Sequence, residues 1–171
     1  MKLFTRAVLI LGASLALWPD LHASPGTDAF ENLKALEGTW DITNDGAAMG
    51  QGTYEVVADG SVVLERVLGM TTTYFLDDDL LMAVHYCSAH NQPRFKATVQ
   101  TTATNVMFEV VDVGGMHNPN DGHMAKLSLV FEDADLFTQS WTWRENGVDL
   151  TPETFIYRRV TVPISVPGIN L

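Results

Sequence analysis

The chain has 171 residues, with 10 Lys and Arg against 21 Asp and Glu, one cysteine, and 46% hydrophobic residues against 18% charged residues. This length and apolar content predict one domain with a hydrophobic core of its own. The formal charge of −11 and the absence of a Lys/Arg cluster exclude nucleic acid as the expected partner, because both oppose contact with a phosphate backbone.

The first 23 residues have the pattern of a secretory signal peptide. Lys2 and Arg6 precede an uncharged apolar stretch over residues 7–18, and Leu21-His22-Ala23 offers a small-residue cleavage site. The stretch is shorter than the roughly twenty apolar residues of a spanning helix. We therefore expect cleavage after Ala23, a periplasmic or secreted protein, and no integral membrane span. An uncleaved N-terminal anchor is the alternative.

The chain after the signal peptide is predicted to begin with a short helix and to continue as strands. Phe30, Leu33 and Leu36 recur at helical spacing, which predicts a helix over 27–36 with Thr27 as its cap. After Gly38, β-branched and aromatic residues alternate at period two between turn signals. About ten strands are predicted, near 39–44, 50–58, 61–68, 70–77, 80–88, 94–101, 105–112, 123–132, 136–144 and 152–160.

Short connections between these strands predict an all-β fold, an antiparallel up-and-down β-barrel. A meander of about ten twisted strands removes its exposed edges by closing on itself. We place this barrel domain at residues 24–162 and a C-terminal tail at 163–171. Alternation along the strands predicts inward faces that carry Phe95, Ala97 and Val99, then Leu127, Leu129 and Phe131, and finally Phe137, Gln139, Trp141 and Trp143.

The two ends of the predicted barrel resemble those of a known superfamily. Gly38-Thr39-Trp40, preceded by a short helix, resembles the G-x-W opening of the lipocalin and fatty-acid-binding barrels, the calycins. Arg158-Arg159 on the last strand resembles the arginine that covers this tryptophan in the family. The resemblance implies that Trp40 closes one end of the barrel beneath Arg158 or Arg159.

Several inner segments resemble a group of uncharacterised bacterial lipocalin-like proteins akin to the DUF1579 family. They include His85-Tyr86-Cys87, Asn91-Gln92-Pro93-Arg94 and Gly122-His123-Met124, and the resemblance spans roughly residues 33–160. The chain departs from the family at Ala125, where members carry a second histidine. The resemblance implies a ligand-binding barrel but brings no established reaction with it.

His85 and Cys87 lie two residues apart on one predicted strand and so share a face, with β-carbons roughly 6.5 Å apart. A Cys/His nucleophile also needs an orienting group and an oxyanion hole, for which the sequence offers no obvious place. Cys87 has no second cysteine with which to form an intramolecular disulfide. A buried, inert cysteine is therefore the alternative to covalent catalysis.

His117 and His123, together with His85 and Cys87, form a candidate set of metal ligands, because histidine and cysteine both bind zinc. Their spacing matches no standard zinc pattern, so we expect neither a metal nor another cofactor. The alternatives are metal binding, haem ligation through His117 or His123, or histidines that simply face solvent. We predict that His85 lies within about 8 Å of His117 or His123 at one mouth of the barrel.

The amides and guanidinium of Asn91-Gln92-Pro93-Arg94 suit a carboxylate or another planar polar group. Parity places Arg94 opposite Phe95, which favours an exposed turn unless Pro93 marks a bulge that redirects the side chain. The candidate ligand-binding residues are therefore His85, Cys87, Arg94, His117, His123, Gln139 and Trp141.

Three functions follow from this pattern. The first is an exported barrel that binds a small, mostly apolar or amphipathic molecule in its interior. The second is an enzyme, or a metal- or haem-binding barrel, that uses the His/Cys cluster. The third is a ligand-free structural protein of the cell envelope with a filled barrel.

Overall fold

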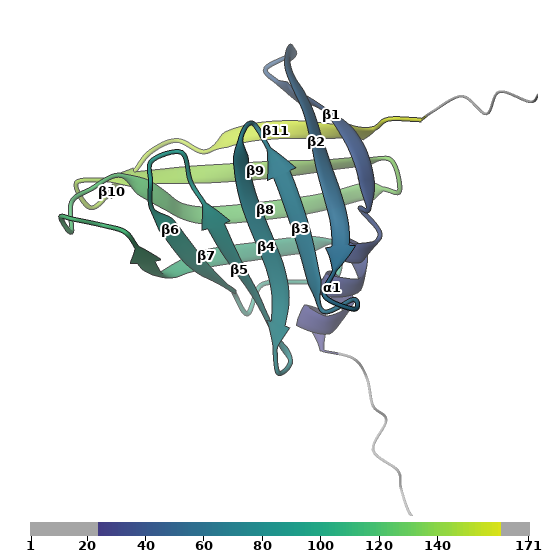
Figure 1. Ribbon diagram of the computed structural model, residues 1–171, viewed down its shortest axis with the longest axis horizontal. Helices are drawn as coiled ribbons and strands as arrows, with labels where there is room; N and C mark the ends of the chain where they lie inside the picture. Colours follow the sequence, from purple (N-terminus) through teal and green to yellow (C-terminus); the bar gives the residue numbers. More distant parts are fainter. Residues whose placement is uncertain (1–23, 162–171) are drawn as a thin grey trace, which may run out of the picture.

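The computed structural model describes residues 24–161, so the predicted signal peptide at 1–23 and the predicted tail at 163–171 lie outside the described residues. Within this range the chain forms a closed antiparallel β-barrel of ten strands, with one short helix before it (Figure 1). The predicted fold class is confirmed. None of the described residues belongs to a helix long and apolar enough to cross a membrane.

Hairpins connect most of the strands in chain order. Their bounds are β1 (Gly38–Asn44), β2 (Ala47–Val57), β3 (Val62–Val67), β4 (Met70–Asp77), β5 (Leu80–Tyr86), β6 (Gln92–Ala97), β7 (Asn105–Gly114), β8 (His123–Asp133), β9 (Leu136–Glu145), β10 (Val148–Asp149) and β11 (Glu153–Arg159). The ring closes because β11 pairs with both β1 and β9. The two-residue β10 pairs with β9 alone and adds no strand to the ring among the described residues.

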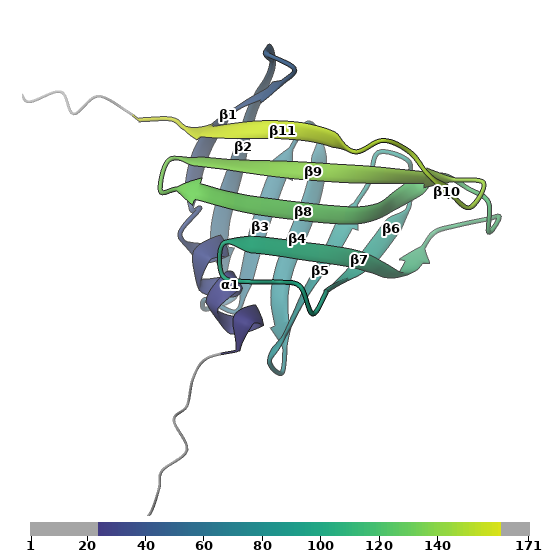
Figure 2. The same cartoon turned by 180° about the vertical axis from the view of Figure 1, so that it is seen from behind.

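The barrel has two different ends. Antiparallel connection places the β1–β2 turn, the β3–β4 turn and the segment between β10 and β11 at one end, here called the open end. The β2–β3 and β4–β5 turns lie at the other, the closed end, together with helix α1 (Pro25–Lys34), which crosses the barrel there (Figure 2).

Helix α1 starts two residues before the predicted Thr27. Ser24 is its N-cap and accepts a hydrogen bond from the Thr27 amide at 3.2 Å, while Pro25 takes the first helical position, where a missing N–H costs nothing. Its buried face consists of Ala29, Phe30 and Leu33. Gly26 is required at the contact with the barrel, because a Cβ there would lie 2.7 Å from the carbonyl oxygen of Asp79 in the β4–β5 turn.

Trp40 seals the closed end, as predicted. Its side chain is fully buried, and its indole N–H donates to the Leu36 carbonyl at 2.8 Å. The guanidinium carbon of Arg159 lies 4.3 Å from the ring centroid, so Arg159 and not Arg158 is the covering arginine. Phe137 packs edge-on against Trp40 at 4.7 Å and stacks on Tyr157 at 4.4 Å, which fills this half of the barrel with aromatic rings.

The predicted strand over 94–101 is wrong at both ends. The strand is Gln92–Ala97, and the Thr101 amide then bonds back to the Thr98 carbonyl at 3.0 Å. Alternation stops where this turn begins, so Val99 is 96% exposed and does not share the inward face of Phe95.

Candidate functional site

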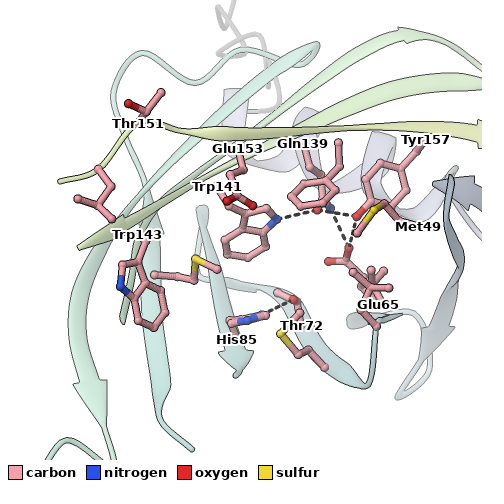
Figure 3. Close-up of a pocket in the computed structure, with 16 residues that line it drawn as sticks. Met49, Glu65, Thr72, His85, Gln139, Trp141, Trp143, Thr151, Glu153 and Tyr157 are labelled. Atoms are coloured by element: carbon pink, nitrogen blue, oxygen red, sulfur yellow. Dashed lines mark hydrogen bonds between the residues drawn. The ribbon is translucent and has the colours of Figure 1, made fainter. Parts of the chain in front are cut away.

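The open half of the barrel encloses a cavity of about 470 Å³ (Figure 3). Most of its wall is apolar and comes from Met49, Val67, Leu68, Met70, Met124, Trp141, Trp143, Leu150 and Phe155. Its polar lining consists of Glu65, Thr72, His85, Gln139, Thr151, Glu153 and Tyr157. Strand alternation explains the arrangement, because buried residues recur at every second position of β3, β4 and β9.

Glu65 is a buried carboxyl group in the middle of the barrel, with only 3% of the residue exposed. Tyr74 donates to its Oε2 at 2.7 Å, and the amide of Gln139 donates to its Oε1 at 2.9 Å. Burial raises the pKa of Glu65, and hydrogen bonds from Tyr74, Tyr54, Gln139 and Thr72 oppose part of that rise. Its hydrogen-bond partners are neutral side chains, so no ion pair within the described chain offsets the loss of hydration.

Gln139 connects this carboxyl group to the rest of the barrel. Its Nε2 donates to the Tyr54 hydroxyl at 2.6 Å as well as to Glu65. Its Oε1 accepts from the indole N–H of Trp141 and from the Tyr157 hydroxyl, both at 3.0 Å. All four hydrogen-bonding positions of the amide are therefore used, which fixes which atom is oxygen and which is nitrogen.

His85 lies on β5 within the same cavity and is 3% exposed. Its Nδ1 lies 3.0 Å from the Thr72 hydroxyl, and its ring centroid lies 4.8 Å from that of Trp141. Its Nε2 is buried and has no hydrogen-bond partner among the described residues. Burial lowers the pKa of His85 to about 4, so the imidazole is neutral at neutral pH.

The seven candidate residues do not gather in one place. His85, Gln139 and Trp141 line the main cavity. Arg94 is exposed on the outer face and forms an ion pair with Asp112, as its parity implied. The ligand-binding roles of these candidate residues stay predictions.

The other three candidates lie toward the open end but outside the cavity lining. His117 lines a second hollow of about 280 Å³, formed by the β5–β6 turn and the β7–β8 loop, and Trp143 borders both hollows. His123 is buried, and its Nδ1 lies 3.0 Å from the Asp121 carbonyl oxygen. Cys87 is half-buried at the start of the β5–β6 turn. In residues 24–161, no three His, Cys, Asp or Glu side chains gather as metal ligands would.

Sequence reasoning missed Glu65, Thr72 and the three tyrosines of the polar network, Tyr54, Tyr74 and Tyr157. A signal for Glu65 was present, because it alternates with Val63 and Val67 on a predicted strand. A charged residue on the inward face of a barrel strand needs buried partners, and it therefore marks a position to examine.

Comparisons with known proteins assign no family. No family model matches the chain, and no curated protein matches its sequence. Among solved structures, it is similar to the crystal structure of Rv2717c from M. tuberculosis, with 14% sequence identity over 78% of this chain and 98% of that chain and a TM-score of 0.49. The lipocalin-like and DUF1579-like resemblance therefore stays a prediction.

Proposed function

We propose that this is an exported binding protein whose barrel holds one small, mostly apolar molecule. The observation that carries the proposal is His85, a residue of the cavity lining whose buried Nε2 has no hydrogen-bond partner in the described chain. Buried polar atoms are nearly always hydrogen bonded, so an unpaired one in a cavity indicates where a ligand's polar end belongs. The apolar wall then receives the remainder of the molecule.

The cavity volume favours this function over a filled structural barrel. About 470 Å³ falls within the range of small-molecule sites, which is roughly 300 to 1,000 Å³. Three residues of the wall, Met49, Leu68 and Leu150, are 38%, 45% and 50% exposed, so the apolar surface continues from the cavity to its mouth. A ligand with an apolar tail fits such a mouth.

Export is the second part of the proposal. The basic start, the apolar stretch over 7–18 and the small residue Ala23 support a cleaved signal peptide. N-terminal sequencing of protein recovered from outside the cytoplasm tests it. A mature N-terminus at Ser24 is expected, whereas exported material that begins at Met1 contradicts the proposal.

Titration with N-phenyl-1-naphthylamine, a neutral apolar fluorophore, tests binding in the cavity. Met70 lines the cavity, whereas Met107 is exposed on β7. Met70→Trp should weaken probe binding at least about tenfold by filling the cavity, and the matched Met107→Trp should leave it unchanged. Equal binding by both variants would place the probe elsewhere. Native mass spectrometry of protein from its own host would then identify the natural occupant, haem and metal included.

A further inference from the structure

The hydrogen-bond donors at the floor of the cavity are already committed to protein acceptors. Trp141 and Tyr157 donate to the Gln139 oxygen, and both amide protons of Gln139 go to Tyr54 and Glu65. Each of these groups has its donor capacity filled. The floor of the cavity therefore offers a ligand hydrogen-bond acceptors.

His85 contributes a buried polar atom without a partner. Its Nδ1 lies 3.0 Å from the Thr72 hydroxyl oxygen, while its Nε2 has no hydrogen-bond partner in the described chain. A hydroxyl oxygen can accept from a protonated Nδ1, and in that tautomer Nε2 is a hydrogen-bond acceptor. We assign this tautomer to His85, which leaves Nε2 with a free lone pair.

The cavity wall carries two acidic side chains and no Lys or Arg to pair with them in the described chain. Glu65 lines its floor and Glu153 its wall, while no Lys or Arg occurs among the sixteen lining residues of the described chain. Thr72 lies between Glu65 and His85 (Figure 3), so the carboxyl group and the imidazole belong to the same part of the floor. Trp141 and Trp143 add aromatic rings, which attract cations to their faces.

These observations deepen the proposed function and rest on it. We propose that the cavity selects amphiphiles with a cationic nitrogen head, a primary ammonium that donates to Nε2 of His85 with the carboxylate of Glu65 as its counter-ion. A cation in the cavity favours the ionised form of Glu65, and a buried carboxylate acts over several ångströms in a poorly hydrated site, so direct contact with Glu65 is not required. The apolar tail lies along the wall toward Met49, Leu68 and Leu150. An anionic head of the same size is rejected, because it would meet Glu65 with no arginine or lysine to pair with.

Three amphiphiles with one tail and different heads test this selectivity: n-octylamine, 1-octanol and sodium octanoate. Calorimetric titrations near pH 7 keep the amine protonated. Salt at about 0.5 M shortens the Debye length to a few ångströms, so attraction of the amine to the overall negative charge of the protein does not mimic binding at a specific site. Octylamine should bind roughly tenfold to hundredfold more tightly than octanol, the range expected for a hydrogen bond to a charged group, and octanoate should bind weakest.

Two isosteric variants locate the charge that selects the amine. Glu65→Gln should remove the preference for octylamine over octanol, whereas Glu153→Gln, which neutralises an exposed residue of the same cavity, should keep it. If Glu65→Gln does not fold, the wild-type preference in high salt decides the proposal. Octanol or octanoate binding as tightly as octylamine would overturn the selectivity and leave the proposed binding function standing. Failure of all three amphiphiles to bind would overturn both.

Discussion

Gln139 on β9 donates a hydrogen bond of 2.9 Å to the carboxyl group of Glu65 on β3, across the interior of the barrel. The two strands are not neighbours in the sheet, so this bond joins opposite walls directly. Tyr54, Trp141 and Tyr157 bond to the same amide. The network separates the aromatic half of the barrel from its hollow half, and it defines the floor of the cavity.

Loss of the Gln139 amide should destabilise the whole barrel. Gln139→Leu leaves the buried groups of Glu65, Tyr54, Trp141 and Tyr157 without a partner, which should lower the free energy of unfolding by about 3 to 5 kcal/mol. Ser140→Ala is the control, because Ser140 bonds to Thr154 on the outer face and should cost less than about 1 kcal/mol. Urea unfolding followed by tryptophan fluorescence measures both. Similar midpoints for the two variants would contradict a structural role for the network.

Arg159 should contribute far more to stability than its neighbour Arg158. Its guanidinium covers Trp40 and donates to the carbonyl oxygens of Glu37, Ala35 and Ala134 at 2.9 Å, whereas Arg158 is exposed. Arg159→Met should cost about 2 to 4 kcal/mol and Arg158→Met about 0.5 kcal/mol or less. Thermal denaturation compares the pair. A loss confined to Arg158→Met would mean that the closing arginine is misassigned.

Much of the fold was predictable because its determinants are local. Period-two alternation located the strands, turn signals such as Asn146-Gly147 located their ends, and Gly38-Thr39-Trp40 located the closed end. The exceptions have local causes too. Ser24 offered a better cap than Thr27, and a turn that begins at Thr98 ended a strand whose alternation suggested that it continued.

The candidate site was predictable only in part, because its members meet through closure of the barrel. His85, Gln139 and Trp141 were identified as inward-facing candidates, but the sequence gives no measure of which side chains end at the same depth. Glu65 and Thr72 come from two other strands, and their partners lie up to 92 residues away. His117 was grouped with His85 by residue type, although the β7–β8 loop places it at a different hollow.

The titration of His85 should make stability fall in acid. Its pKa is about 4 in the folded state against an ordinary value of 6.5, so the unfolded chain binds more protons between these values. The stabilisation is complete above pH 6.5 and is lost as pH falls toward 4. At about 1.4 kcal/mol per pKa unit, the full loss amounts to about 3 to 4 kcal/mol, most of which is reached by pH 4.

Urea unfolding of His85→Gln between these pH values measures this contribution. The difference in unfolding free energy between wild type and variant should shrink as pH falls, because the variant has no imidazole to protonate. His117→Gln, which changes an exposed histidine outside the cavity lining, is the matched control substitution. A parallel curve for His85→Gln would show that His85 is hydrated in the folded protein.

Glu65 should give the opposite pH dependence. Its pKa is raised from the ordinary value of 4.5 by burial, so the folded protein keeps a proton that the unfolded chain has lost. This contribution is complete below 4.5 and is lost as pH rises through the folded-state pKa. Relative to Glu65→Gln, wild type should therefore become less stable with rising pH, and Glu153→Gln is the matched control substitution. Above pH 4.5 the contributions of Glu65 and His85 to the unfolding free energy change with pH in opposite directions, so the wild-type pH profile alone hides both. The difference between wild type and each single variant separates them.

A Glu65→Gln curve parallel to wild type would mean that Glu65 is ionised equally easily in both states. In that case Glu65 would not be a desolvated carboxyl group without a cationic partner, and a cationic ligand would gain nothing from it.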